Sequence, residues 1–307
     1  MRFGSARSRI RPVPAGLIGV AAAIAALAAS PAQRGTRDRH VYVSVVDRNN
    51  LPVTDLTTRD VVVREDGAVR ELTSVGRATA PMQIALLADD SQAAQPLILE
   101  LREGLAAFDQ AVATSNPDSE VALWTFGERP TRALDFTPSV AAMTRGIGTV
   151  FSRPGSGAYF MEAMIEATHD LIRKGATRPI IVAFIVEDSP EFSTTTEQSV
   201  INALKASHAA LWTIVLQGRN PGNFADVEQR YRSAVIADDA RASGGGSRII
   251  LDRTGLKDAY AAVFAGLTAQ IDVAYSRPDR LVPPSKLEVA LTRPGLRLSA
   301  APRWAGQ

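Results

Sequence analysis

Two short loops carry the side chains best suited to polar chemistry, and each follows an apolar run. The loop Asp89-Asp90-Ser91-Gln92-Ala93 comes directly after residues 84–88, and Glu187-Asp188-Ser189 comes directly after residues 180–186. Both runs are typical of short buried strands. Ligands of open α/β sheets bind beyond the carboxyl ends of the strands, so these oxygens stand where a binding site is expected. The simplest role for Asp89 is structural, because a carboxylate there can accept backbone N–H groups of the following segment.

Other reactive constellations are absent from the sequence. The three histidines, His40, His169 and His208, fall in a strand start and two separate helices and have no ligand spacing. The chain has no cysteine, which excludes a thiolate metal site and a cysteine nucleophile. It also has no Gly-x-Ser-x-Gly elbow. The glycine run at 243–247 lacks the lysine of a phosphate loop and is interpreted as a flexible turn.

One helical segment leaves a hydrolase open as an alternative. Glu162, Glu166 and Asp170 recur at i, i+4 and i+8, which places three carboxylates along one helix face. Hydrolysis by carboxylates needs a partner carboxyl across a cleft, and the sequence identifies none. We therefore interpret this face as solvated and expect no enzymatic activity.

The elements that position the two loops alternate between strands and helices. This alternation predicts an α/β fold with a doubly wound, mostly parallel sheet that is covered on both faces. The expected strands are 84–88, 121–126, 180–186, 211–216 and 249–251. The expected helices are 97–108, 140–151, 160–172, 200–209, a stretch within 224–242, and 256–271.

Both ends of the chain change to a β pattern. Residues 40–77 alternate apolar and polar positions and contain Asp66-Gly67, a pair that favours a two-residue hairpin turn. Residues 280–307 contain Leu287, Val289 and Leu291 in strict alternation, then a turn at Pro294-Gly295 and a second short run. We predict a C-terminal hairpin that packs against residues 40–77, so that both ends form one small β appendage.

The loop after residues 84–88 resembles the Asp-x-Ser-x-Ser loop of von Willebrand factor type A domains. The flanks VYVSVVDRNNLPVTDLTTRDVVVREDGAVRELTSV and KLEVALTRPGLRLSAAPRW resemble those of the exported von Willebrand factor A-related proteins common in Acidobacteria. The resemblance implies an A-type domain over residues 81–275, of Rossmann-like architecture, between two β segments. It covers nearly all of the chain after its first residues.

The resemblance also implies where a metal would bind. Many A-type domains hold Mg²⁺ or Mn²⁺ with the aspartate and both serines of this loop, a threonine and a further aspartate. Asp89 and Ser91 match the first two ligands, but Ala93 replaces the second serine, and Ala158, or Gly157 one residue earlier, aligns with the threonine. Glu187 or Asp188 could take the place of the last ligand, displaced by one or two positions. Because a methyl group cannot coordinate, Asp89, Ser91 and Asp188 form a degenerate site, for which we expect no cofactor beyond weak Mg²⁺ binding.

The N-terminus has the layout of a signal peptide. Four arginines precede an apolar run from Ala15 to Ala29, and small residues offer a cleavage point after Ala32, with Ala26 and Ala28 as an alternative pair. We expect residues 1–32 to be removed on export to the periplasm or medium, with an uncleaved membrane anchor as the alternative. Their removal lowers the formal net charge from +2 to −2, and the remaining basic residues are interleaved with acidic ones. Nucleic acid is therefore not an expected partner, and no later run is long enough to span a membrane.

These features predict an extracytoplasmic protein-binding module of adhesion or scaffold type. Its contact surface would surround the loops at Asp89, Gly155 and Asp188, and its partner would be a protein that the sequence does not specify. The alternative is an adhesion or sensing domain in which a divalent ion held by Asp89 and Ser91 binds a carboxylate of the partner.

Overall fold

The computed structural model describes residues 36–219, 226–278, 281–282 and 284–304. The predicted signal peptide at 1–32 lies outside the described residues. Within the described part of the chain, no helix is both long and apolar enough to cross a membrane.

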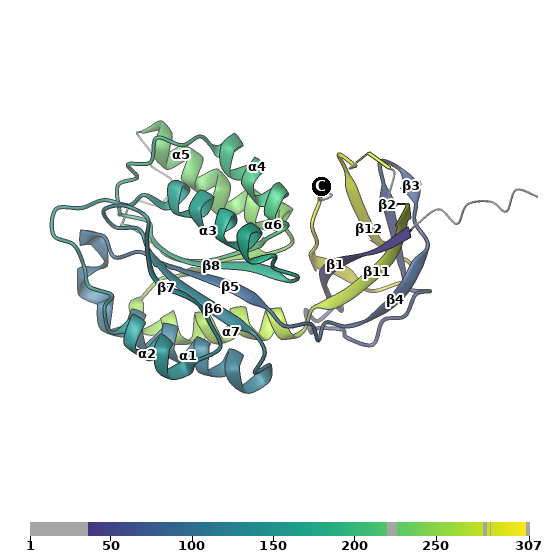
Figure 1. Cartoon of the computed structure of the whole chain (residues 1–307), viewed down its shortest axis with the longest axis horizontal. Coiled ribbons are helices and arrows are strands. Elements are labelled where there is room, and N and C mark those ends of the chain that lie inside the picture. Colours follow the sequence, from purple (N-terminus) through teal and green to yellow (C-terminus); the bar gives the residue numbers. More distant parts are fainter. Residues whose placement is uncertain (1–35, 220–225, 279–280, 283, 305–307) are drawn as a thin grey trace, which may run out of the picture. The chain divides into compact units, whose positions relative to one another are not determined.

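Residues 83–268 form the larger of two regions, and a six-stranded sheet lies at its centre (Figure 1). Its order is β7-β6-β5-β8-β9-β10, and neighbouring strands are parallel except at the edge, where β7 runs antiparallel to β6. Strand β8 is buried along its whole length because it has a strand on each side and helices on both faces. The bounds are β5 Gln83–Ala88, β6 Glu120–Thr125, β7 Thr131–Thr137, β8 Pro179–Val186, β9 Ala210–Leu216 and β10 Gly246–Ile250.

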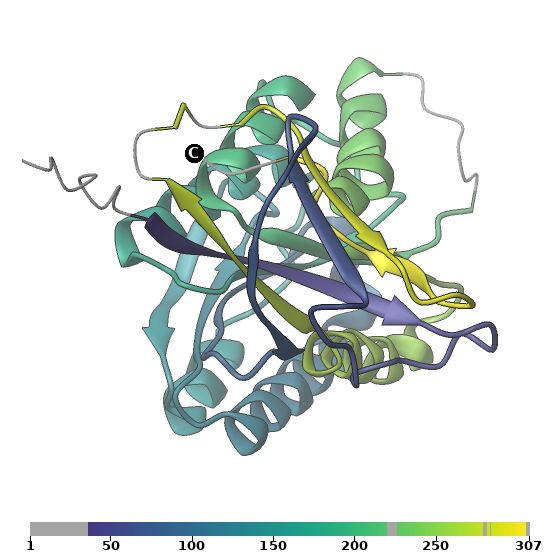
Figure 2. The same ribbon diagram turned by 90° about the vertical axis from the view of Figure 1, so that its right-hand side faces the viewer.

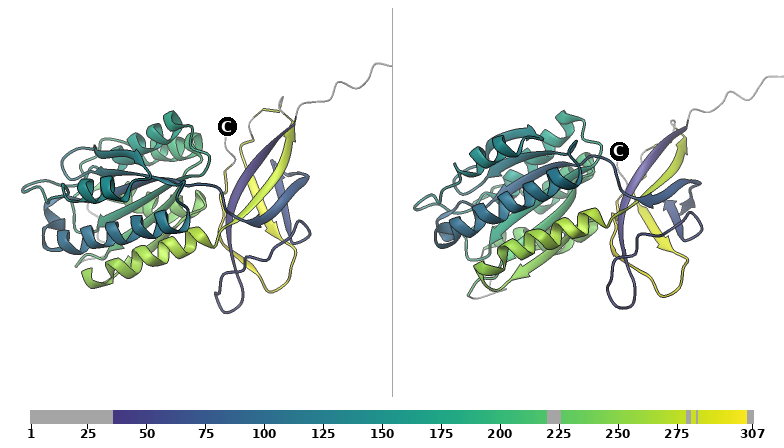
Figure 3. Two further views of the ribbon diagram at one scale, coloured as in Figure 1. Left: turned by 60° about the horizontal axis from the view of Figure 1, so that its bottom comes forward. Right: turned by 90° about the horizontal axis from the view of Figure 1, so that it is seen from below.

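Helices cover both faces of this sheet, as Figure 1 shows. One face packs against α1, α2 and α7, and α1 lies beside α7 (Figure 3). The other packs against α3, α4 and the α5–α6 segment. The predicted doubly wound α/β fold is therefore confirmed. The helices are α1 Ile98–Ser115, α2 Val140–Ile147, α3 Phe160–Lys174, α4 Glu197–Ser207, α5 Val227–Ala234, α6 Ala240–Ala242 and α7 Leu256–Thr268, with a π-helical turn at Val235–Asp239 and 3₁₀ turns at Gln92–Leu97 and Arg253–Gly255.

The smaller region consists of two antiparallel sheets with orders β13-β1-β11-β4 and β12-β2-β3. Their apolar faces enclose a separate core that includes Val43, Val63 and Val273. Strands from both ends of the chain lie side by side in these sheets (Figure 2). The bounds are β1 Thr36–Val46, β2 Val61–Glu65, β3 Ala68–Val69, β4 Leu72–Arg77, β11 Ile271–Pro278, β12 Leu287–Leu291 and β13 Arg297–Ala300.

The predicted C-terminal hairpin is wrong in its pairing. Strand β12 pairs with β2, and β13 pairs with β1, so the two strands lie in different sheets and are not hydrogen-bonded to each other. The alternation of Leu287, Val289 and Leu291 correctly indicated a strand. It could not indicate the partner, because an edge strand of either sheet offers the same backbone groups.

Three local predictions also need correction. The helix expected to reach residue 271 ends at Thr268, and Ile271 begins β11. Strand β7 was not expected at all. The glycine run at 243–247 is not a flexible turn, because Gly246 and Ser247 belong to β10, and a Cβ atom on Gly245 would lie 1.8 Å from the carbonyl oxygen of Leu211. At Gly245 the backbone passes so close to the backbone of Leu211 that only glycine fits there.

Candidate functional site

Asp89 connects the carboxyl ends of β5 and β8. One carboxylate oxygen accepts the backbone N–H of Ser91 at 2.9 Å, and the other accepts that of Val186 at 3.1 Å. The backbone N–H of Asp89 continues the sheet by donating to the carbonyl of Phe184 at 3.1 Å. The aspartate therefore satisfies backbone donors at the point where two parallel strands end, and it is fully buried.

Burial raises the pKa of Asp89 above its usual value. The hydrogen bonds from Ser91 and Val186 and the positive charge of Arg232 act in the opposite direction. Removal from water disfavours the charged carboxylate, whereas donors and a nearby cation favour it.

Asp90 points toward the neighbouring loops. Its carboxylate accepts the backbone N–H of Gly127 at 2.6 Å and forms an ion pair with Arg153, whose Nε lies 3.0 Å away. The backbone N–H of Arg153 also donates to the Asp90 carbonyl at 2.8 Å. Asp90 thus holds the loop that precedes α3 against the loop that follows β5.

The structure brings together only two of the three predicted ligands. Ser91 follows Asp89 and is buried, and its hydroxyl accepts a hydrogen bond from that of Ser189 at 2.9 Å. Asp188 is exposed and turned away, and its carboxylate accepts the backbone N–H of Arg219 at 3.1 Å. Ser189, one position later, occupies the place beside Ser91 where the sequence suggested Asp188.

The two alanines in the degenerate loop positions belong to the hydrophobic core. Ala93 is partly buried and packs against the core on the α1 side of the sheet. Ala158 is fully buried on the other side, and its backbone pairs with the segment at Pro190 and Phe192. Neither position offers an oxygen from its side chain.

Arg232 was not identified from the sequence. It projects from α5, is only 1% exposed, and donates to the carbonyls of Ser189 at 2.7 Å and Glu187 at 2.8 Å. Its guanidinium also lies 3.7 Å from the carboxylate of Glu191. Burial raises the pKa of Glu191 to about 7, against the effect of the Arg232 charge. Nothing in the helix sequence distinguishes Arg232 from Arg230, which is exposed.

The donor set around Asp89 does not fit a divalent cation of the kind the resemblance implies. Such ions take about six oxygens, and Mg²⁺ needs near-octahedral geometry. Here backbone N–H groups occupy both oxygens of Asp89, Asp188 points away, and Arg232 already supplies a positive charge. Nor do any three histidine or acidic side chains of the described residues form a metal-binding group.

A groove with exposed aromatic side chains lies next to this buried cluster. We call it the aromatic groove, and it is lined by Phe151, Tyr159 and Phe192 together with Arg153 and Glu128. Its volume is about 570 Å³. Phe151 is 61% exposed and Phe192 is 49% exposed.

The walls of the aromatic groove are held in place by specific contacts. The rings of Tyr159 and Phe192 meet edge to face with centroids 6.1 Å apart, and the guanidinium of Arg102 lies 4.2 Å from the ring centre of Phe151. A Cβ atom at Gly157 would lie 2.6 Å from the Phe192 ring, so glycine is required for this packing. Both exposed aromatics are thus positioned by neighbours and do not extend freely into solvent.

The three carboxylates of α3 do not form a second site. Asp170 is buried and forms ion pairs with Arg132 and Arg173, so the interpretation of a solvated face is wrong for this residue. Glu162 accepts hydrogen bonds from Thr194, whereas Glu166 is exposed.

Comparison with known proteins gives matches among solved structures, whereas neither a protein-family model nor a curated protein matches the chain. The SpRpn10 VWA domain is 18% identical, covers 59% of this chain and 94% of that chain, and gives a TM-score of 0.42. A von Willebrand factor type A protein from Catenulispora acidiphila is 10% identical, covers 88% of this chain and 73% of that chain, and gives 0.48. Three N-terminal domains of the type V pili tip protein Mfa5 from Porphyromonas gingivalis are 14% identical. The match covers 49% of this chain and 26% of that chain, with a TM-score of 0.33.

At these identities the likenesses concern the fold alone. The strand order, with five parallel strands and one antiparallel edge strand, is that of a doubly wound sheet whose loops after β5 and β8 meet at one edge. The larger region has the doubly wound α/β fold that the sequence predicted, and the solved von Willebrand factor type A domains are structures to which it is similar. The narrower resemblance to exported relatives common in Acidobacteria stays a prediction.

Proposed function

We propose that this chain is an exported protein-interaction module that binds a protein partner through the aromatic groove, without a divalent ion. The observation that carries the proposal is the pair of exposed aromatic side chains, Phe151 and Phe192, beside a groove of about 570 Å³. Aromatic and arginine side chains dominate the binding energy of protein interfaces. The groove presents both kinds, since Arg153 also lines it.

The position of the groove supports binding more than catalysis. It lies at the edge of the sheet where ligands of doubly wound folds bind. The carboxylates nearest to it are engaged, because Asp90 and Glu128 both pair with Arg153. Asp89 itself is fully buried, so we place the contact surface on the Gly155 loop and Phe192, beside the loop at Asp89.

Arg232 supports a metal-independent mode of binding. In the adhesion sites implied by the resemblance, a divalent ion would supply the positive charge beside the aspartate. Here a buried guanidinium supplies that charge, and it is hydrogen-bonded to two carbonyls of the loop after β8. A protein cation that holds the loop in place leaves no role for a second cation there.

Capture of partners from the exported fraction under mild crosslinking tests this function. The double variant Phe151→Ala with Phe192→Ala should reduce the captured protein by about tenfold or more, because truncating central aromatic contacts typically has effects of this size. The matched control, Leu51→Ala with Val69→Ala, removes two exposed apolar side chains of the β region and should leave capture unchanged.

Two results would contradict the proposal. Capture that survives the double variant would move the interface away from the aromatic groove. Capture that is abolished by EDTA would favour the alternative, in which a metal held by Asp89 and Ser91 binds a carboxylate of the partner. Export is tested separately by N-terminal sequencing of the secreted or periplasmic form. The first residue of that form should lie near Gln33.

A further inference from the structure

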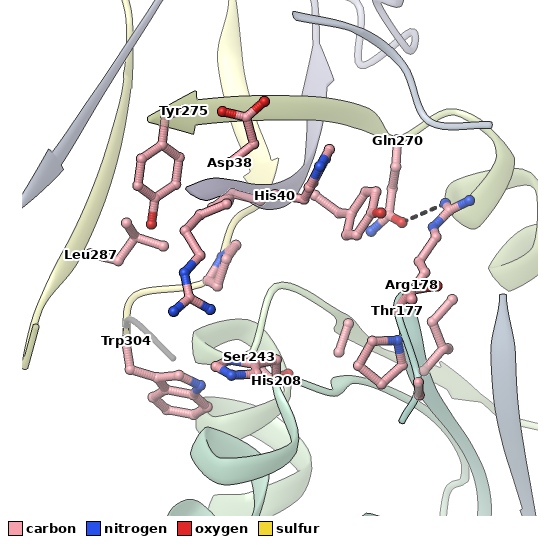
Figure 4. Close-up of a pocket in the computed structure, with 18 of the residues that line it drawn as sticks. Asp38, His40, Thr177, Arg178, His208, Ser243, Gln270, Tyr275, Leu287 and Trp304 are labelled. Atoms are coloured by element: carbon pink, nitrogen blue, oxygen red, sulfur yellow. Dashed lines mark hydrogen bonds between the residues drawn. The ribbon is translucent and has the colours of Figure 1, made fainter. Parts of the chain in front are cut away.

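A second cavity lies at the opposite edge of the central sheet, where β8 begins at Pro179. It has a volume of about 330 Å³ and is lined by residues of β1, β8, β11 and the segment that follows β13 (Figure 4). Functional ligand pockets have volumes of roughly 300–1,000 Å³. None of the residues discussed so far for protein binding contributes to it.

Arg178 is a buried guanidinium at one end of this pocket. It is 3% exposed and donates to the carbonyl of Leu267 at 2.7 Å and to the side-chain oxygen of Gln270 at 2.9 Å. The ring of Tyr42 lies 5.0 Å from the guanidinium carbon. Its Nε has no hydrogen-bond partner among the described residues, and no carboxylate forms an ion pair with it there. Burial lowers the pKa of Arg178, whereas Tyr42 and the negative charge of Asp272 act in the opposite direction.

Gln270 presents a second unsatisfied donor beside the first. It is 1% exposed, its side-chain oxygen is bonded to Arg178, and its Nε2 has no partner among the described residues. Figure 4 shows the two side chains facing each other at the same end of the pocket. Buried donors are usually hydrogen-bonded to protein or to ordered water, so these two adjacent donors favour a hydrogen-bond acceptor beside them.

The rest of the pocket favours a single negative charge. Arg39 is half-buried and makes no ion pair or side-chain hydrogen bond with a described residue, whereas Arg277 and Arg70 share the carboxylate of Glu65, at 3.1 Å and 2.9 Å. Three arginines and two carboxylates line the pocket, an excess of one positive charge, and the nearby Asp272 pairs with His40. Tyr42, Tyr275 and Trp304 also line the pocket with aromatic rings, and Figure 4 shows those of Tyr275 and Trp304.

We propose that this pocket binds a small organic monoanion, a carboxylate carried on a flat apolar body. The carboxylate accepts hydrogen bonds from Nε2 of Gln270 and Nε of Arg178, and Arg39 contributes a further positive charge. Guanidinium groups match the planar geometry of a carboxylate, and the aromatic walls match a flat ring. A dianion such as a phosphate monoester would face Asp38 and Glu65 with only one net charge to balance two.

Fluorine NMR of 4-fluorobenzoate with the full chain tests this proposal. The ligand resonance should broaden and shift saturably, whereas the neutral 4-fluorobenzamide of the same shape should show no response at equal concentration. The variant Arg39→Gln should weaken benzoate binding by about tenfold, as expected for the loss of one charged contact. Arg248→Gln, a change at an exposed arginine outside the pocket, should have no effect.

The variant Gln270→Glu separates loss of binding from loss of folding. It keeps an acceptor for Arg178 and replaces the free donor with a negative charge, so it should abolish benzoate binding while its melting temperature stays equal or rises. The proposal is overturned if benzamide binds as well as benzoate, if neither binds at millimolar concentration, or if binding survives both variants. Stronger binding of 4-fluorophenyl phosphate than of benzoate would also overturn the assignment of a monoanion.

Discussion

The guanidinium of Arg232 lies 3.7 Å from the carboxylate of Glu191, and both side chains are almost completely removed from solvent. This pair joins α5 to the segment after β8, next to the buried aspartate at the end of β5. An arginine held in this way forms part of the packing, because two backbone carbonyls depend on it as well.

Replacing Arg232 with methionine should destabilise the protein by about 3–5 kcal/mol, the usual effect of removing one partner of a buried ion pair. The carbonyls of Ser189 and Glu187 would lose their donors at the same time. Chemical denaturation measures the effect. Arg230→Met, at an exposed position of the same helix, is the matched control and should change stability by less than about 0.5 kcal/mol. Equal stabilities of the two variants would show that the buried pair has no structural role.

The stability of the protein should depend on Glu191 between about pH 4.5 and pH 7. Burial raises the pKa of this carboxyl to about 7, well above the usual value for glutamate. In this range the folded protein keeps a proton that the unfolded chain has lost, so the free energy of unfolding falls as the pH rises. Thermal melts at pH 5 and pH 8 should therefore differ less in Glu191→Gln than in the wild type.

The buried carboxyl groups of Asp109 and Asp239 also make the free energy of unfolding fall as the pH rises. Burial raises the pKa of Asp109 and of Asp239 to about 6, so their contributions are lost at lower pH than that of Glu191. Glu166→Gln, at an exposed position, should leave the pH dependence unchanged. A dependence that is identical in wild type and Glu191→Gln would refute the assignment of this carboxyl.

Thermal melts in EDTA and in millimolar Mg²⁺ should superimpose. A tight site would raise the free energy of unfolding by roughly 2.7 kcal/mol at a hundredfold excess of ligand over its dissociation constant. We expect no such shift, because backbone N–H groups occupy both oxygens of Asp89 and Asp188 points toward Arg219. A clear shift with Mg²⁺ in the wild type would contradict this expectation and support metal-dependent adhesion.

Truncation after Pro278 should destabilise the β region. Strand β13 pairs with β1 and β12 pairs with β2, so their removal leaves two unpaired strand edges and exposes the core that they cover. We expect a lower melting temperature and new protease cleavage within residues 36–77, measured by limited proteolysis and mass spectrometry. Unchanged cleavage there would show that the C-terminal strands are dispensable.

Apolar runs made the central sheet predictable. The runs at 84–88 and 180–186 correspond to β5 and β8, because a strand buried on both faces consists almost wholly of apolar residues. Strand β7 escaped prediction because it is a half-buried edge strand with mixed polarity. Strand β11 escaped because only Ala269 and Gln270 separate it from α7, so its first apolar residues continued the helical pattern.

The sequence by itself determined the doubly wound fold, the placement of Asp89 and Ser91 at a strand end and the lack of oxygens at Ala93 and Ala158. Tertiary structure alone decided that Asp188 turns outward, that Arg232 supplies the buried charge, and that Gln270 and Arg178 meet with donors that no described residue satisfies. The physical reason is the distance along the sequence over which each effect acts. Periodicity and propensity act between neighbours along a chain, whereas the direction and burial of a polar side chain depend on elements far away in the sequence that pack against it.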